Sequence, residues 1–150
     1  MLGHLDHDLG LGPIDQVAYV VEDMQRAVAC YAALFGPFTV TDHKLDACSY
    51  RGRQVDLSLK MAVNDAGPIE IELLQPVLGQ SPLSEHIEAH GEGLHHVRFR
   101  VQQIDPKLEE LRGHRFEPLL YKRFGPEVAF AYVETPPELG GHVIELLEMP

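Results

Sequence analysis

The stretch Gly91-Glu-Gly-Leu-His-His-Val-Arg-Phe-Arg-Val101 decides the fold that the sequence predicts. Its two glycines indicate a turn, and the residues that follow alternate in polarity, as along a strand with one buried face. The apolar face is formed by Val97, Phe99 and Val101. The opposite face carries an imidazole and two guanidinium groups, those of His96, Arg98 and Arg100. Such a polar face would normally meet solvent, but the same strand pattern occurs twice in the chain.

The earlier copy of this strand is Ile14-Asp-Gln-Val-Ala-Tyr-Val-Val21. Aligned with Leu94–Val101, it places Gln16 at the position of His96 and keeps the apolar positions in register. Both residues offer an atom that can bind a metal, and both lie on the strand face opposite the apolar set. The alignment therefore predicts that the two strands have equivalent places in the fold.

A second repeat, Ile-Glu-Leu-Leu, occurs at 71–74 and again at 144–147, and it places Glu72 at the position of Glu145. Internal repeats are stronger evidence for architecture than other sequence signals, so we predict two copies of one module of roughly 70–80 residues. The predicted organisation is a flexible N-terminal tail at 1–12 and a single domain at 13–150. Within that domain the modules lie at about 13–76 and 93–150, and 77–92 connects them.

Each module is predicted to contain a strand, a helix and three further strands. The first helix follows Asp23, whose carboxylate can cap it, and ends at Gly36-Pro37. The second is expected to start with Asp105 as its cap and to end at Gly113. The later strands are predicted near 38–42, 54–61, 69–75, 116–121, 128–134 and 142–147. The fold class is thus α+β: two tandem βαβββ modules form a curved, mostly antiparallel sheet with helices on its convex side and a cup on its concave side.

Composition limits the classes of partner. The chain of 150 residues suits one domain with a sizeable core, and its net charge of −11 argues against a nucleic-acid partner. The two cysteines form neither a disulfide framework nor a metal-finger spacing. No stretch approaches the roughly 18 apolar residues of a membrane span, and the N-terminus has no signal-peptide pattern. We therefore expect a cytoplasmic protein that has no membrane partner.

The alternation of side chains also predicts what lines the cup. The four residues at the repeat positions, Gln16, Glu72, His96 and Glu145, all lie opposite the apolar face of their strands. They can therefore converge on one concave surface. Two carboxylates that face a histidine and an amide oxygen in a buried place need a cation, because an isolated buried carboxylate is too costly to leave ionised. The sequence predicts a site for one divalent metal ion, and mixed nitrogen and oxygen ligands do not distinguish Zn, Ni, Co, Mn or Fe.

The chain resembles the vicinal oxygen chelate superfamily, which includes glyoxalases, bleomycin resistance proteins and extradiol dioxygenases, over about residues 13–149. Three segments carry the resemblance: Ile14-Asp-Gln-Val-Ala-Tyr for the first strand, Ser81–Val97 for a stretch of methylmalonyl-CoA epimerases, and Gly140–Glu148 for the last strand. In these families the metal ligands fall on the same four positions of this chain. The ligand set Gln, Glu, His, Glu is the pattern of one class of glyoxalase I, whereas the surrounding sequence is closer to the epimerases.

The resemblance implies a divalent-metal-dependent isomerase or lyase that transfers a proton next to a carbonyl group, either epimerase-like or glyoxalase I-like (lactoylglutathione lyase). By similarity to glyoxalase I, Glu145 would act as ligand and base, and by similarity to the epimerases Asp56 would be a second catalytic acid. Arg98 and Arg100 could bind a substrate carboxylate or phosphate, or form internal salt bridges to Glu70 or Glu134. We expect an anionic carbonyl compound or thioester as substrate, and a homodimer.

Two other classes stay open. A metal-free binding or drug-sequestering protein can have the same architecture, although such proteins usually lack the ligand set. An extradiol dioxygenase needs two histidines and one carboxylate around iron, and Gln16 stands where one of those histidines would be. One further expectation concerns register: the alternation places His95 on the face of Val97, away from the cup, so His96 should be the ligand.

Overall fold

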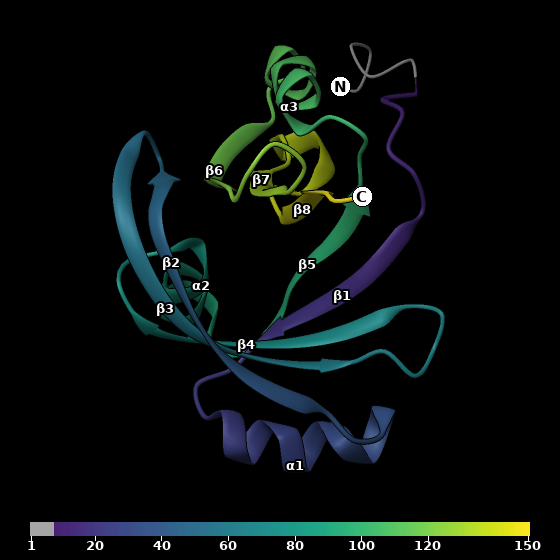
Figure 1. The fold of residues 1–150 in the computed structure, drawn as a ribbon, viewed down its shortest axis with the longest axis vertical. Coiled ribbons are helices and arrows are strands. Elements are labelled where there is room, and N and C mark those ends of the chain that lie inside the picture. Colours follow the sequence, from purple (N-terminus) through teal and green to yellow (C-terminus); the bar gives the residue numbers. More distant parts are fainter. Residues whose placement is uncertain (1–7) are drawn as a thin grey trace.

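The computed structural model describes residues 8–150 and forms one eight-stranded barrel with helices around it (Figure 1). In chain order the elements are β1 (Ile14–Val20), α1 (Met24–Phe35), β2 (Thr39–Tyr50), β3 (Arg53–Asn64), β4 (Glu70–Leu78), α2 (Pro82–His90), β5 (Gly93–Arg100), α3 (Ile104–Gly113), β6 (Glu117–Arg123), β7 (Ala129–Glu134), the 3-10 helix η2 (Pro137–Leu139) and β8 (Val143–Glu148). This order contains the predicted βαβββ module twice.

The strand order around the barrel is β1-β4-β3-β2-β6-β7-β8-β5. In each module the first and last strands are parallel neighbours, β1 with β4 and β5 with β8, and the other pairs are antiparallel. The modules join at two seams, β1 with β5 and β2 with β6, both antiparallel. The predicted α+β class and repeat are confirmed, the two modules pair within one chain, and the sheet closes on itself.

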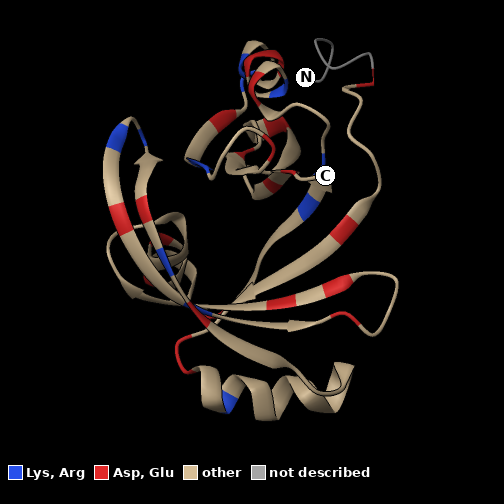
Figure 2. Ribbon diagram, in the orientation of Figure 1, with Lys and Arg blue, Asp and Glu red and all other residues tan. Residues whose placement is uncertain are grey.

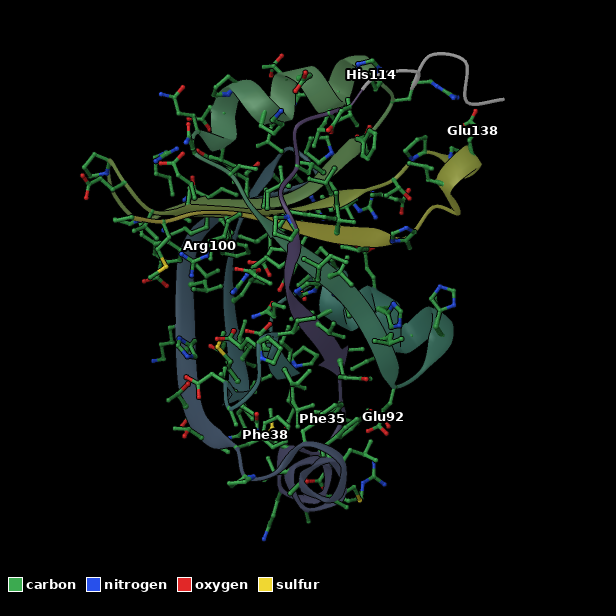
Figure 3. The ribbon with its side chains drawn as sticks, turned by 90° about the vertical axis from the view of Figure 1, so that its right-hand side faces the viewer. Phe35, Phe38, Glu92, Arg100, His114 and Glu138 are labelled. Carbon is green, nitrogen blue, oxygen red and sulfur yellow. The ribbon has the colours of Figure 1, made fainter. Side chains whose placement is uncertain are left out.

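The outer helices cover the two ends of the molecule. α1 packs against β3 and β4 through a cluster that includes Met24, Ala27 and Leu73, and α3 packs against module two through Ile104 and Leu108. Figure 3 shows this separation: Phe35 of α1 and His114, which follows α3, lie at opposite ends, with the strands between them. Apolar residues on one face of each strand thus hold the helices outside, as the alternation predicted.

A third apolar cluster fills the inside of the barrel. It contains Ala18 and Val20 of β1, Leu74 of β4 and Tyr132 of β7, together with Leu83 of α2. These strand residues occupy the face opposite the helices. The same strand faces carry the predicted metal ligands, so the ligands lie next to a packed, apolar interior rather than in open solvent.

Two local predictions were wrong. The first strand after α1 extends to Tyr50 rather than ending near residue 42, because it continues through an irregularity at Ala47, which has a positive φ of 56°. Asp105 does not cap α3. The Glu148 carboxylate accepts a hydrogen bond from the buried N–H of Ile104 at 2.8 Å and supplies that cap from β8.

The predicted tail at 1–12 lies partly outside the described residues, and its flexibility stays a prediction. Of the part that the structure describes, Leu9 and Leu11 pack against the cluster beneath α3, and the Leu9 carbonyl accepts a hydrogen bond from Lys107 Nζ at 2.5 Å. Among residues 8–150, none of the helices has the length and apolar character that crossing a membrane requires.

Candidate metal site

The four predicted ligands meet inside the barrel, each from a different strand. Gln16 comes from β1, Glu72 from β4, His96 from β5 and Glu145 from β8. His96 Nε2 lies 2.9 Å from Glu145 Oε1, 3.9 Å from Glu72 Oε1 and 3.3 Å from Gln16 Oε1. One ligand atom from each of Glu72, His96 and Glu145 lies within 4.8 Å of the other two, and no second group of this kind occurs in residues 8–150. The strand neighbours β4-β1-β5-β8 bring these side chains together.

Burial leaves the carboxylates of this cluster without enough positive charge nearby to stabilise their ionised forms. The exposed fractions are 0% for Gln16, 5% for Glu72, 3% for His96 and 7% for Glu145. Burial, and then the charge of Glu145, raise the pKa of Glu72 well above its ordinary value. Burial raises the pKa of Glu145 to about 8 against the opposing effect of Arg98, and burial followed by Arg98 lowers the pKa of His96 to about 3. Two carboxylates beside a neutral imidazole therefore lack the positive charge that would let both ionise.

A divalent ion fits this donor set. His96 offers one nitrogen, Gln16 one amide oxygen, and Glu72 and Glu145 one carboxylate oxygen each. Mixed ligands of this kind suit a divalent transition metal, and four protein donors leave positions for water or substrate oxygens in a five- or six-coordinate ion. The charge of the ion would also offset the carboxylate pair, which is the cost that burial imposes on the cluster.

Glu70 fixes the amide of Gln16. Gln16 Nε2 donates to Glu70 Oε1 at 2.6 Å, so Gln16 Oε1 turns toward His96. Glu70 lies two residues before Glu72 on β4 and shares its face of the strand. The sequence prediction considered Glu70 only as a salt-bridge partner of an arginine, and its spacing from Glu72 was the signal that places it at the site.

Arg98 and Arg100 are paired with acidic residues at the boundary between the modules. Arg98 contacts Asp15 Oδ1 at 2.9 Å and Glu70 Oε1 at 3.6 Å, and Arg100 Nε contacts Asp15 Oδ2 at 3.0 Å. Burial tends to raise the pKa of Asp15, but hydrogen bonds and charges of both arginines outweigh it and lower that pKa. Figure 2 shows acidic bands on β1 and β4 beside a basic band on β5, and Figure 3 labels Arg100 between the levels of α1 and α3. The internal pairing with Glu70 that the sequence left open is present.

Asp56 is not brought to this cluster. Its carboxylate is exposed and accepts a hydrogen bond from the Ala47 N–H at 2.8 Å, where β2 is irregular. The next residue, Leu57, points into the barrel interior, so the alternation of β3 turns Asp56 outward. The geometry gives Asp56 a place in the β2–β3 hairpin rather than beside the ligands.

His95 lies beside His96, contrary to the prediction from strict alternation. Ala18 pairs with His96 and Tyr19 pairs with Leu94, so His95 is the extra residue of a β-bulge. Its ring centroid lies 5.4 Å from that of Tyr132, and Tyr132 in turn lies 4.8 Å from His96. The sequence prediction missed both neighbours, because a bulge leaves no mark on the alternating pattern and Tyr132 has no counterpart in the repeat that the alignment used.

A cavity borders His95 but none of the four ligands. It has a volume of about 450 Å³ and its lining includes Arg51, Pro82, His86, His95 and Glu134. The four ligands themselves are buried. His95 therefore lines this cavity and also contacts the ligand His96.

Comparison with known proteins supports the family. A profile described as Glyoxalase/Bleomycin resistance protein/Dioxygenase superfamily matches residues 15–132. The uncharacterized protein YqjC of Bacillus subtilis (strain 168) is 30% identical over 96 residues, which are 60% of this chain and 65% of that protein, slightly less than two thirds of its length.

Solved structures share the fold at low identity. Methylmalonyl-CoA epimerase from Mycobacterium tuberculosis has a TM-score of 0.63 and 18% identity, covering 93% of this chain and 89% of that chain. A Streptomyces coelicolor methylmalonyl-CoA epimerase variant in complex with 2-nitronate-propionyl-CoA has a TM-score of 0.63 and 22% identity, covering 93% of this chain and 99% of that chain. The profile spans both modules and includes three of the four converging residues, and on this ground the chain belongs to the Glyoxalase/Bleomycin resistance protein/Dioxygenase superfamily.

Proposed function

We propose that this protein is a divalent-metal-dependent isomerase or lyase that transfers a proton next to a carbonyl group, with a CoA thioester as the preferred substrate and a glutathione hemithioacetal as the alternative. The convergence of Gln16, Glu72, His96 and Glu145 at one buried point carries the proposal. A binding protein without a metal has no need for two carboxylates packed together in an apolar interior, since each costs free energy to bury.

The roles of the residues follow from their chemistry. Gln16, Glu72, His96 and Glu145 would hold the ion, and the ion would polarise the substrate carbonyl and stabilise the enediolate. Glu145 is the candidate base. Its second carboxylate oxygen can take the proton from the substrate carbon. We assign no role in this reaction to Asp56, because its carboxylate is exposed and accepts a hydrogen bond from the Ala47 N–H.

Of the two arginines on β5, Arg100 is the candidate to bind an anionic substrate. Arg98 is engaged by both Asp15 and Glu70, whereas Asp15 contacts only Nε of the more exposed Arg100. The terminal nitrogens of Arg100 are thus better placed to donate hydrogen bonds to a phosphate or carboxylate. The CoA ester named in the complex of the Streptomyces coelicolor epimerase has phosphates of this kind. We therefore assign anion binding to Arg100 rather than to Arg98.

The first experiment measures metal and proton transfer in the same preparation. The protein is freed of metal with a chelator, reloaded with Zn²⁺, Ni²⁺, Co²⁺, Mn²⁺ or Fe²⁺, and incubated in D₂O with methylmalonyl-CoA or with the hemithioacetal of methylglyoxal and glutathione. We expect one ion per chain and metal-dependent deuterium incorporation into one substrate. A protein that binds no stoichiometric ion, or that exchanges deuterium equally well without metal, would contradict the proposal.

A second experiment tests the substrate class. Replacing Arg100 with Leu should weaken CoA-thioester binding about tenfold, since a hydrogen bond to a charged group contributes about 1.5 kcal/mol in a partly exposed place. Metal content should not change. The matched control is Arg53→Leu, an exposed arginine of β3 in the other module. Equal affinity in both variants and the unchanged protein would remove the support for anion recognition by Arg100.

A further inference from the structure

A chain of contacts reaches His96 from the opposite side to the metal ligands. The Pro82 carbonyl oxygen lies 3.3 Å from His95 Nε2, and His95 Nδ1 lies 2.8 Å from His96 Nδ1. His96 Nε2 then faces Glu145 at 2.9 Å and Gln16 Oε1 at 3.3 Å. Both rings are buried, so water has little access to replace these contacts.

Two arrangements of protons fit the contact between the two rings, and the contact of His95 with the Pro82 carbonyl distinguishes them. A carbonyl oxygen only accepts, so the contact with Pro82 requires the proton of His95 on Nε2. A neutral imidazole has one N–H, so a His95 ring that donates from Nε2 to Pro82 has only a lone pair on Nδ1. His95 Nδ1 is therefore an acceptor. The 2.8 Å contact then places the proton of His96 on Nδ1. The lone pair of His96 Nε2 faces Glu145 Oε1 and Gln16 Oε1, and a cation between these atoms would bind all three.

We propose, on the basis of the metal-dependent function above, that His95 is a positioning residue that holds His96 in the tautomer whose Nε2 binds the metal, with the Pro82 carbonyl as its anchor. A metal-binding histidine usually donates its second ring N–H to a carboxylate, a carbonyl or water. In this chain His95 lies between the ligand His96 and the Pro82 carbonyl. The carbonyl therefore orients His96 indirectly, through the ring of His95.

Three features of the fold hold this arrangement. The β-bulge at His95 places two adjacent histidines on the inner side of β5, which regular alternation would separate. α2 begins at Pro82 and is fixed by the hydroxyl of Ser81, which accepts from the N–H groups of Leu83 and Ser84. The rings of His86 and Tyr132 pack against His95 at centroid distances of 5.2 and 5.4 Å. The anchor and the bulge are therefore both set by backbone structure.

The direct test reads the tautomer of His96 in the metal-free protein. Protein labelled with ¹⁵N in its histidines gives different ring nitrogen shifts for the Nδ1–H and Nε2–H forms, and the His96→Ala spectrum assigns the signals. We expect the Nδ1–H form of His96 in the unchanged protein. The Nε2–H form would overturn the proposal, because His95 would then not direct the lone pair of Nε2 to the metal.

Two nearly isosteric substitutions test the roles of His95 Nδ1 and Nε2 separately. His95→Asn puts an amide oxygen near the position of Nδ1 and keeps the acceptor for His96. His95→Gln extends its amide to the position of Nε2 and keeps only the contact with Pro82. We expect His95→Asn to retain the Nδ1–H form and to bind Zn²⁺ within a few-fold of the unchanged protein. His95→Gln should lose that form and bind Zn²⁺ about 10–100-fold more weakly, the range for partners that orient a ligand.

His86→Ala is the matched control, since His86 packs against His95 but lies outside the hydrogen-bond chain. It should leave the tautomer and the Zn²⁺ affinity unchanged. Equal Zn²⁺ affinity and equal tautomers in the Asn and Gln variants would contradict the proposal, as would a loss in His86→Ala as large as that in His95→Gln. A protein with the Nδ1–H tautomer but no Zn²⁺ binding would contradict the proposed function while leaving the contact between the histidines intact.

Discussion

The two modules contribute matching ligands but orient them by different means. In module one the amide of Gln16 is held by Glu70, and Glu70 in turn contacts Arg98 of module two. In module two His96 contacts His95, which contacts the carbonyl of Pro82. The first support is ionic and crosses the seam between modules, whereas the second is neutral and depends on the bulge and on α2. Equivalent positions in a repeat thus keep the same ligand geometry with different neighbours.

The largest expected effect tests whether the two first-strand ligands are equivalent. His96→Ala should lower the affinity for Zn²⁺ by more than about 100-fold, beyond the loss expected for an orienting partner. Gln16→Ala should lower it about 10–100-fold, because a neutral amide oxygen is a weaker ligand than an imidazole. Competition with a chelator measures both affinities. Equal losses in the two variants would show that the modules contribute equally.

The carboxylates differ in their proposed roles, and Gln substitutions separate them. Glu145→Gln should lower metal-dependent deuterium exchange about 10²–10⁴-fold, the usual contribution of a general base, beyond any effect on metal affinity. Glu72→Gln should weaken metal binding but keep exchange at saturating metal within about tenfold. Exchange rates are compared at saturating Zn²⁺ for both variants. A larger loss of exchange in Glu72→Gln would assign the base to module one.

A substitution of Glu70 removes the hydrogen-bond acceptor that orients Gln16 and leaves all four proposed ligands unchanged. Glu70→Ala should lower Zn²⁺ affinity about 10–100-fold, because Gln16 loses the acceptor that turns its oxygen toward His96. Glu88→Ala, at an exposed position of α2, controls for the loss of one negative charge. Isothermal titration of both variants gives the comparison. If both variants lose the same affinity, the effect is long-range charge and Glu70 does not orient the amide.

The smallest expected effect is the dependence of stability on pH. Burial raises the pKa of Glu145 to about 8 from its ordinary 4.5, so its contribution to stability is present at low pH and is lost as pH rises through 8. His95 and His96 have pKa values lowered to about 3 from 6.5, so their contribution increases with pH only up to about 6.5. The melting temperature of the metal-free protein should therefore decrease as the pH rises from 6.5 to 8.

Bound metal should remove this loss, because the ion stabilises the ionised carboxylates and competes with protons for them. Melting curves of the metal-free and the Zn²⁺-loaded protein between pH 6.5 and 8 check the difference. Glu145→Gln should flatten the metal-free curve as well. A melting temperature of the metal-free protein that increases over this interval would contradict the assignment of a raised pKa to the carboxylates.

The repeat and the alternation predicted much of the site. Gln16, Glu72, His96 and Glu145 were identified because each stands opposite the apolar face of its strand at a matched position, and the structure brings all four together. The residues around them were harder to place. The outward direction of Asp56 depends on the register of a long hairpin with an irregular strand, and the sequence pattern of that segment does not define the register.

The sequence by itself determined the two modules, the α+β class and the inward faces of the strands. The alternation of polar and apolar residues along a strand identifies its buried face without knowledge of the strands beside it. Only the tertiary structure decided the neighbours of the ligands: the bulge that brings His95 against His96, the Pro82 carbonyl that it meets, and the pairing of Arg98 with Asp15 and Glu70. These contacts join residues far apart in the chain or depend on one extra residue in a strand. They follow from how strands pair around the closed barrel, and local side-chain preferences do not encode that pairing.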